Sequence, residues 1–186
     1  MSAQLSTMPR ASVIGLGNIL LGDDGFGPCT VEMFRCKYEC GPDVEILDVV
    51  TPGVDLAPYL CGRELVVLVD ALDAPRPPGT LCICRWDTIA RSQVELRLTG
   101  HDPGLGEAFA QLRLLDQAPA QVMVVGVVPK SCTFNGGIST EVFRTASIAL
   151  DRIAGLLLDH GARCEPRAVP LSPKLWWVDG LATLTC

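Results

Sequence analysis

The chain has 186 residues, of which 48% are hydrophobic and 19% are charged, and this composition excludes a disordered protein. Its formal net charge is -6, with 21 acidic against 15 basic residues and no cluster of lysines or arginines, which argues against binding to nucleic acid. The mean hydropathy is +0.32, but the longest apolar stretch, Val122 to Val128, is far too short to span a bilayer, so we expect no association with membranes.

We expect a single domain over residues 1–186. Residues 1–10 lack the apolar core of an export signal and predict a loose N-terminus. The proline-rich segment 163–186, which contains Trp176 and Trp177, predicts a C-terminal tail. Without an export signal, the expected compartment is the cytoplasm, where the nine cysteines stay reduced.

Two pairs of cysteines are close together in the sequence. Cys36 and Cys40 are expected on one face of a helix, and Cys82 and Cys84 on one face of a strand. Neither spacing is typical of a zinc site, and no second pair follows at the spacing of a zinc finger. We therefore interpret these thiols as core or surface residues and not as metal ligands.

Short apolar runs alternate with amphipathic segments along the chain. In order, the pattern predicts a strand at Ser12–Leu16, a helix at Gly27–Glu39, a strand at Val44–Val49, a short helix at Val54–Leu60, strands at Leu65–Val69 and Thr80–Trp86, a helix with Leu105, Phe109, Leu112 and Leu115 on one face, a strand at Gln121–Val128 and a long helix at Thr140–Leu158. Ser139 and Gly161 are the expected caps of the last helix. This alternation predicts an α/β fold, a three-layer αβα sandwich with a twisted, mainly parallel sheet.

The most informative segment is the glycine-rich loop after the first strand, Gly15 to Gly27. A glycine-rich turn that leaves a first strand usually binds phosphate, but Asp23 and Asp24 would repel an anion there and favour a cation. A dinucleotide-binding motif fits only in part, because Leu20 occupies the position of the third glycine. The loop therefore indicates a metal site more strongly than a nucleotide site.

Three candidate ligands are predicted to meet at one edge of the sheet. Ligand sites in parallel sheets lie beyond the carboxyl ends of the strands. Asp24 follows the first strand, Asp70 ends the third and His101 lies in a later loop. Two carboxylates and one imidazole suit a divalent ion such as nickel, zinc or iron, and they leave coordination positions open for substrate or water.

These residues also have structural interpretations. Asp23 and Asp24 precede a helix and can cap its amides, Asp73 in the turn after the third strand is an alternative acid, and His101 can be a solvated loop side chain. His160 lies near a helix C-terminus, where a histidine suits the dipole, and has no assigned role. No Gly-x-Ser-x-Gly motif is present, and a Cys–His pair stays open without positive support.

Segments spread over most of the chain match, in order, those of one protein family. They are Gly15–Gly27, Val44–Asp48, Thr51–Leu56, Val66–Ala71, His101–Leu105 and Val124–Pro129. In these segments the chain resembles the hydrogenase maturation endopeptidases, cytoplasmic peptidases that trim the C-terminus of the large subunit of nickel-iron hydrogenases. The resemblance implies a phosphorylase/hydrolase-like fold in which helices sandwich a mainly parallel sheet.

The resemblance places the family's metal-binding and catalytic residues at Asp24, Asp70 and His101, with Glu at the first position in some members. It implies a metal-dependent endopeptidase, grouped as aspartyl-type, that cuts the large-subunit precursor after the basic residue following its last Cys-x-x-Cys motif. Nickel is then part of the recognised substrate and not a resident cofactor, although the site is expected to take cadmium or zinc in vitro. We expect a monomer that pairs transiently with this precursor.

Two other functions stay open at this point. A chaperone that reads the metal and holds the same precursor without cutting it needs the same three ligands and no nucleophile. An unrelated α/β protein that binds a small ligand or a nucleotide is the third interpretation. If the protein is the endopeptidase or the chaperone, candidates for client specificity are the loop from Lys130 to Gly137 and the pair Trp176 and Trp177.

Overall fold

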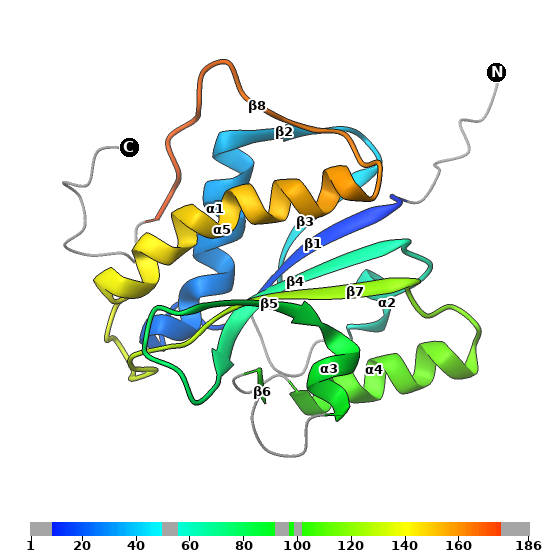
Figure 1. The fold of residues 1–186 in the computed structure, drawn as a ribbon, viewed down its shortest axis with the longest axis horizontal. Coiled ribbons are helices and arrows are strands. Elements are labelled where there is room, and N and C mark those ends of the chain that lie inside the picture. Colours follow the sequence, from blue (N-terminus) through cyan, green and yellow to red (C-terminus); the bar gives the residue numbers. More distant parts are fainter. Residues whose placement is uncertain (1–8, 50–55, 92–96, 99–101, 176–186) are drawn as a thin grey trace.

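The computed structural model describes residues 9–49, 56–91, 97–98 and 102–175. Within them, helices cover both faces of a central sheet, which confirms the predicted three-layer α/β fold (Figure 1). The strand order is β3-β1-β4-β7-β5, and β6 pairs with β4 outside this path. The strands are β1 (Ala11–Leu16), β3 (Val44–Val49), β4 (Leu65–Asp73), β5 (Leu81–Arg85), β6 (Arg97–Leu98) and β7 (Gln121–Val127).

The sheet is mainly parallel, as predicted. Neighbouring strands among β3, β1, β4 and β7 run in the same direction, while β5 is antiparallel to β7 and the short β6 is antiparallel to β4. The carboxyl ends of the four parallel strands therefore meet at one edge of the sheet, and the loops that follow β1, β4 and β7 leave from that edge.

Two hydrophobic clusters fill the spaces between the layers. Val67 and Val69 of β4 face the cluster under α1 and α5, and Val66 and Leu68 face the cluster under α2, α3 and α4. The uniformly apolar run Leu65–Val69 at the start of β4 thus reflects burial on both faces. The helices are α1 (Phe26–Lys37), α2 (Ala57–Leu60), α3 (Trp86–Arg91), α4 (Asp102–Leu114) and α5 (Thr140–Asp159), with the 3-10 helix η1 (Gly22–Gly25) before α1. In the described part of the chain, no helix is long and apolar enough to cross a membrane.

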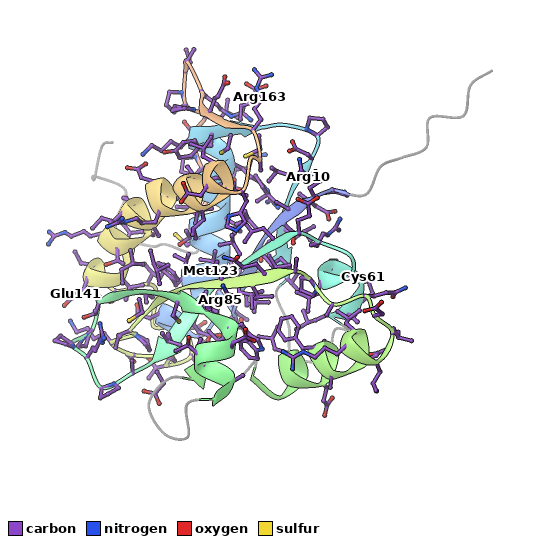
Figure 2. All side chains as sticks on the ribbon, turned by 45° about the vertical axis from the view of Figure 1, so that its right-hand side comes forward. Arg10, Cys61, Arg85, Met123, Glu141 and Arg163 are labelled. Carbon is purple, nitrogen blue, oxygen red and sulfur yellow. The ribbon has the colours of Figure 1, made fainter. Side chains whose placement is uncertain are left out.

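The long helix α5 has both predicted caps. The Ser139 hydroxyl accepts a hydrogen bond from the Val142 amide at 3.4 Å, and Gly161 has the left-handed backbone, with φ of 71°, that ends many helices. Figure 2 shows Glu141 and Arg163 near the two ends of this helix. Its predicted core stripe is buried: Val142, Ala146, Ile153 and Leu157.

The structure contains a second, two-stranded sheet that the sequence pattern did not predict. The helix predicted to reach Glu39 ends instead at Lys37, and β2 (Tyr38–Cys40) pairs antiparallel with β8 (Cys164–Pro166). The Tyr38 ring stacks on Phe34 at 4.9 Å between centroids and its backbone is extended, which stops the helix. The predicted common helix face of Cys36 and Cys40 is therefore wrong.

The other cysteine pair lies as predicted. Cys82 and Cys84 are two positions apart in β5, and both pack against the cluster under α3 and α4, which confirms that they share one face of the strand. The short elements α3 and β6 are further additions to the predicted pattern.

Gly27 lets α1 approach the sheet closely. A Cβ built there would lie 2.0 Å from the Leu16 carbonyl oxygen and 2.4 Å from that of Val69. We expect Gly27→Ala to push α1 away from β1 and β4 and to lower the free energy of unfolding by about 2–3 kcal/mol, measured by chemical denaturation. The control is Gly155→Ala in α5, where nothing lies within 4 Å of the added Cβ. That change should raise stability by about 0.5–1 kcal/mol, and equal effects at the two positions would contradict the close approach.

Candidate active site

The two predicted carboxylates lie in elements that meet at the carboxyl edge of the sheet. Asp24 belongs to η1, which connects β1 to α1, and Asp70 lies in β4 opposite Gly126 of β7. Since η1 packs against β4, the fold brings the two acids into one region. Both are buried, with 6% of Asp24 and 0% of Asp70 exposed. Figure 1 shows the start of α1 and the segment between β7 and α5 at this same edge.

Asp24 is held by the glycine-rich loop around it. Its Oδ2 atom accepts a hydrogen bond from the Asn18 amide at 2.7 Å. Gly17 makes this turn possible, because its φ of 126° is unfavourable for other residues and an added Cβ would lie 1.9 Å from the Asp24 carbonyl oxygen. The carboxylate of Asp24 is thus fixed by backbone groups and does not cap α1, whose N-cap is Gly25 without a side-chain bond.

Asp70 lies inside a strand and not at its end. The prediction that the strand stops here is wrong, because β4 continues to Asp73 through backbone pairing of Leu72 and Asp73 with β6. The Oδ1 atom of Asp70 accepts a hydrogen bond from the amide of Ala71 at 2.7 Å. Asp73, the alternative acid, is the exposed last residue of β4.

Asp23 has a different role from its neighbour. Its carboxylate accepts hydrogen bonds from the amides of Lys130, Ser131 and Ser139 at 2.7, 3.1 and 2.6 Å, and from the Ser139 hydroxyl at 3.0 Å. The predicted capping of α1 by Asp23 is therefore wrong. Asp23 instead ties the segment between β7 and α5 to η1, and its side chain is fully buried in doing so.

Cys132 is a neighbour of the acids that the sequence pattern does not single out. Partial desolvation of its thiol, followed by the negative charges of Asp24 and Asp23, raises the pKa of Cys132 to about 11, and Asp70 adds to the shift. The thiol is consequently protonated at neutral pH, unlike the thiolate of a cysteine peptidase. Its proximity arises from the Asp23 tether, which no local sequence pattern reveals.

The third predicted ligand, His101, lies outside the described residues, as do Trp176 and Trp177. Over residues 9–49, 56–91, 97–98 and 102–175, no group of at least three His, Cys, Asp or Glu side chains is placed to hold a metal ion. The described part of the site is thus a pair of oxygen-donor side chains, Asp24 and Asp70, whose chemistry suits a divalent cation with further donors from elsewhere.

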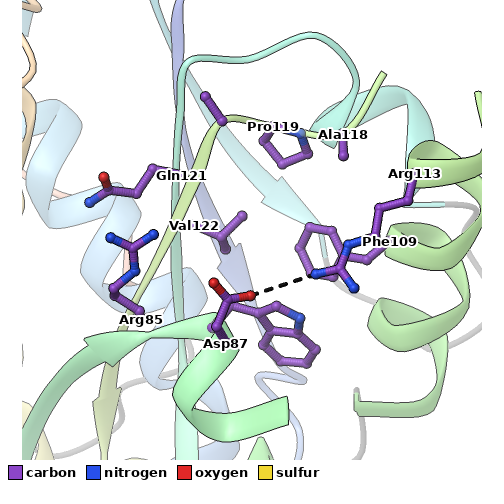
Figure 3. Close-up of a pocket in the computed structure, with 10 residues that line it drawn as sticks. Arg85, Asp87, Phe109, Arg113, Ala118, Pro119, Gln121 and Val122 are labelled. Atoms are coloured by element: carbon purple, nitrogen blue, oxygen red, sulfur yellow. Dashed lines mark ion pairs between the residues drawn. The ribbon is translucent and has the colours of Figure 1, made fainter. Parts of the chain in front are cut away.

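A cavity of about 140 Å³ lies away from these acids (Figure 3). It is formed where β5 ends and β7 begins, which is the opposite edge of the sheet, and is lined by Arg85, Trp86 and Gln121 among others. Across it, the Arg113 guanidinium points toward the Asp87 carboxylate at 3.6 Å. The cavity and the candidate site therefore lie at opposite edges of the sheet.

Comparisons with known proteins agree on one family. A family model described as hydrogenase maturation protease matches residues 28–156. The hydrogenase expression/formation protein HoxM of Cupriavidus necator is 30% identical over 161 residues, which are 86% of this chain and 80% of that protein. The hydrogenase 2 maturation protease of Escherichia coli is 31% identical over 159 residues, covering 85% and 96%.

A solved structure shares the fold. The hydrogenase maturating endopeptidase HybD from Escherichia coli superposes with a TM-score of 0.77 at 29% identity, covering 86% of this chain and 98% of that one. The chain belongs to the hydrogenase maturation protease family.

Proposed function

We propose that this protein is an endopeptidase that removes a C-terminal extension from the nickel-loaded precursor of a nickel-iron hydrogenase large subunit. The observation that carries the proposal is the pair of buried carboxylates, Asp24 and Asp70, at the carboxyl edge of a sheet shared with maturation proteases. Ligand sites of parallel sheets lie at the carboxyl ends of the strands, and buried carboxylates gathered at that edge favour a functional role.

The backbone orients both acids for such a role. One oxygen of Asp24 is held by the Asn18 amide and one oxygen of Asp70 by the Ala71 amide. Hydrogen bonds of this kind fix the orientation of a ligand before the metal arrives. In our proposal these carboxylates, together with His101, complete the coordination of nickel that the substrate carries, so the nickel is read as part of the substrate.

The chemistry follows from that arrangement. Substrate nickel polarises the carbonyl of the scissile bond and lowers the pKa of an attacking water. Asp24 or Asp70 accepts the proton of that water or orients it.

The partner of the proposed reaction is the precursor of the large subunit of a nickel-iron hydrogenase. The segment between Lys130 and Gly137 borders the acids and presents Phe134 with 69% exposure, so it is well placed to contact this client. We further propose that the protein acts as a cytoplasmic monomer that meets the precursor transiently.

A precursor-binding experiment distinguishes this peptidase from a metal-reading chaperone. The nickel-loaded precursor is incubated with the protein, and the mixture is separated by gel filtration. We expect a shortened large subunit that elutes alone. A full-length precursor that stays in complex with the protein would instead support the chaperone, and tight binding of a dinucleotide in a direct titration would support the small-ligand alternative.

A further inference from the structure

The small sheet far from the acids brings two thiols together. Cys40 of β2 and Cys164 of β8 are directly opposite each other, and their sulfur atoms are 3.1 Å apart. They are separated by 124 positions in the sequence, so the contact depends entirely on the fold. Figure 2 shows Arg163, the residue before Cys164, at the end of the molecule where this sheet lies.

The backbone at this pair matches the geometry of a cross-strand disulfide. The Gly41 amide bonds to the Arg163 carbonyl at 2.9 Å and the Arg167 amide to the Lys37 carbonyl at 2.8 Å. These bonds make Cys40 and Cys164 a non-hydrogen-bonded pair, in which Cα atoms of antiparallel strands are about 4.5 Å apart. This separation is within the range of about 4.4–6.8 Å that disulfides span.

The two thiols differ in access and in acidity. Cys164 is 2% exposed, whereas Cys40 is half-buried and lines a cavity of about 380 Å³ together with Pro42 and Arg167. The hydrogen bond between the two thiols lowers the pKa of Cys40 and raises the pKa of Cys164. Cys40 is therefore the thiol that a reagent reaches first and the better nucleophile at neutral pH.

The geometry points to a redox-active dithiol: we propose that Cys40 and Cys164 are oxidised to an intramolecular disulfide by a small-molecule disulfide such as oxidised glutathione. The Cys40 thiolate attacks one sulfur of the reagent and releases one glutathione thiolate. Cys164 then loses its proton to solvent and attacks the Cys40 sulfur of the mixed disulfide, releasing the second thiolate. The protein dithiol is oxidised by two electrons, and one disulfide is reduced to two glutathiones.

The disulfide would secure a weak part of the fold. Three residue pairs join β2 to β8, so few backbone bonds hold the two strands to each other, although Tyr38 and Cys164 pack in the core cluster under α1 and α5. Glu39 and Glu165 also face each other across it, which is unfavourable for like charges, although Arg167 and Arg163 lie near them. A covalent bond here closes a loop of more than a hundred residues and restricts the unfolded chain strongly.

The test equilibrates the full-length protein with mixtures of reduced and oxidised glutathione. Alkylation of remaining thiols followed by peptide mapping should identify one peptide pair, linked through Cys40 and Cys164. The oxidised protein should melt about 10 °C above the reduced protein. Cys40→Ser should abolish both effects. Cys61→Ser is the matched control, since Cys61 is also partly buried but its thiol donates a hydrogen bond to the Gln117 side chain, and the change should preserve both effects.

Two results would overturn the proposal that Cys40 and Cys164 form a redox-active dithiol. One is complete alkylation of Cys40 and Cys164 in every mixture, and the other is a disulfide that joins different cysteines. Both results come from peptide mapping of the wild-type protein, so they do not depend on whether the serine variants fold. Neither readout involves the hydrogenase precursor, so the outcome is independent of the proposed peptidase function.

Discussion

Replacement of Asp70 by asparagine is expected to abolish cleavage of the nickel-loaded precursor, with kcat/KM lower by about a thousandfold or more. The change keeps the size of the side chain and an oxygen that can accept the Ala71 amide, so the strand should stay intact. It removes the negative charge that in our proposal completes the coordination of substrate nickel and accepts a proton from the attacking water or orients that water. Cleavage rates from mass spectrometry or gel densitometry measure the loss.

Asp73→Asn is the matched control for this experiment. Asp73 lies on the same strand, three positions further along, but it is exposed and ends β4. Its replacement should leave the cleavage rate within about twofold of the wild-type rate, because exposed charges interact weakly. Full cleavage by the Asp70→Asn variant, or an equal loss of cleavage rate in both variants, would contradict the proposed role of Asp70 in the reaction. Thermal melting of both variants separates loss of chemistry from loss of fold.

Replacement of Asp23 by alanine is expected to lower the free energy of unfolding by about 4 kcal/mol, the largest stability change that we predict. The Asp23 carboxylate accepts four hydrogen bonds from the segment between β7 and α5. Without it, the amides of Lys130, Ser131 and Ser139 lose a charged acceptor. Unfolding in urea measures the change, and a fall in melting temperature of about 10 °C should accompany it.

The control for Asp23 removes an interaction of the same segment that is exposed. Lys130 and Glu141 form an ion pair at 2.8 Å, and both side chains are about half exposed. Glu141→Gln should therefore cost less than about 1 kcal/mol. Hydrogen exchange gives a second readout, since amides of residues 130, 131 and 139 should exchange faster in Asp23→Ala only. Unchanged exchange at these amides would show that Asp23 does not hold the segment.

Strong local patterns made much of the fold predictable. The strand predicted at Val44–Val49 has the observed bounds, and the caps of α5 at Ser139 and Gly161 are correct. Each of these has its signal within a few residues: an apolar run, a hydroxyl before a helix, or a glycine after one. The position of Asp24 and Asp70 at one sheet edge also followed, because parallel strands end together.

The elements that the sequence did not reveal depend on distant partners. β2 and β8 contain three residues each, which is too short for a recognisable strand pattern. They form a sheet only because the fold brings these two distant segments together. The extension of β4 beyond Asp70 depends on pairing with β6. Asp23 resembles a helix cap locally, but its partners lie more than a hundred residues away. Local propensity cannot identify such contacts, since tertiary structure decides them.

The most direct test of the proposed function is intact-mass spectrometry of the large-subunit precursor before and after incubation with this protein. Two samples are compared, one precursor loaded with nickel and one free of nickel. We predict that the loaded precursor alone loses a single defined C-terminal peptide, and that His101→Ala prevents this loss. An unchanged mass of the loaded precursor, or equally fast cleavage of the nickel-free precursor, would contradict a peptidase that reads nickel through Asp24, Asp70 and His101.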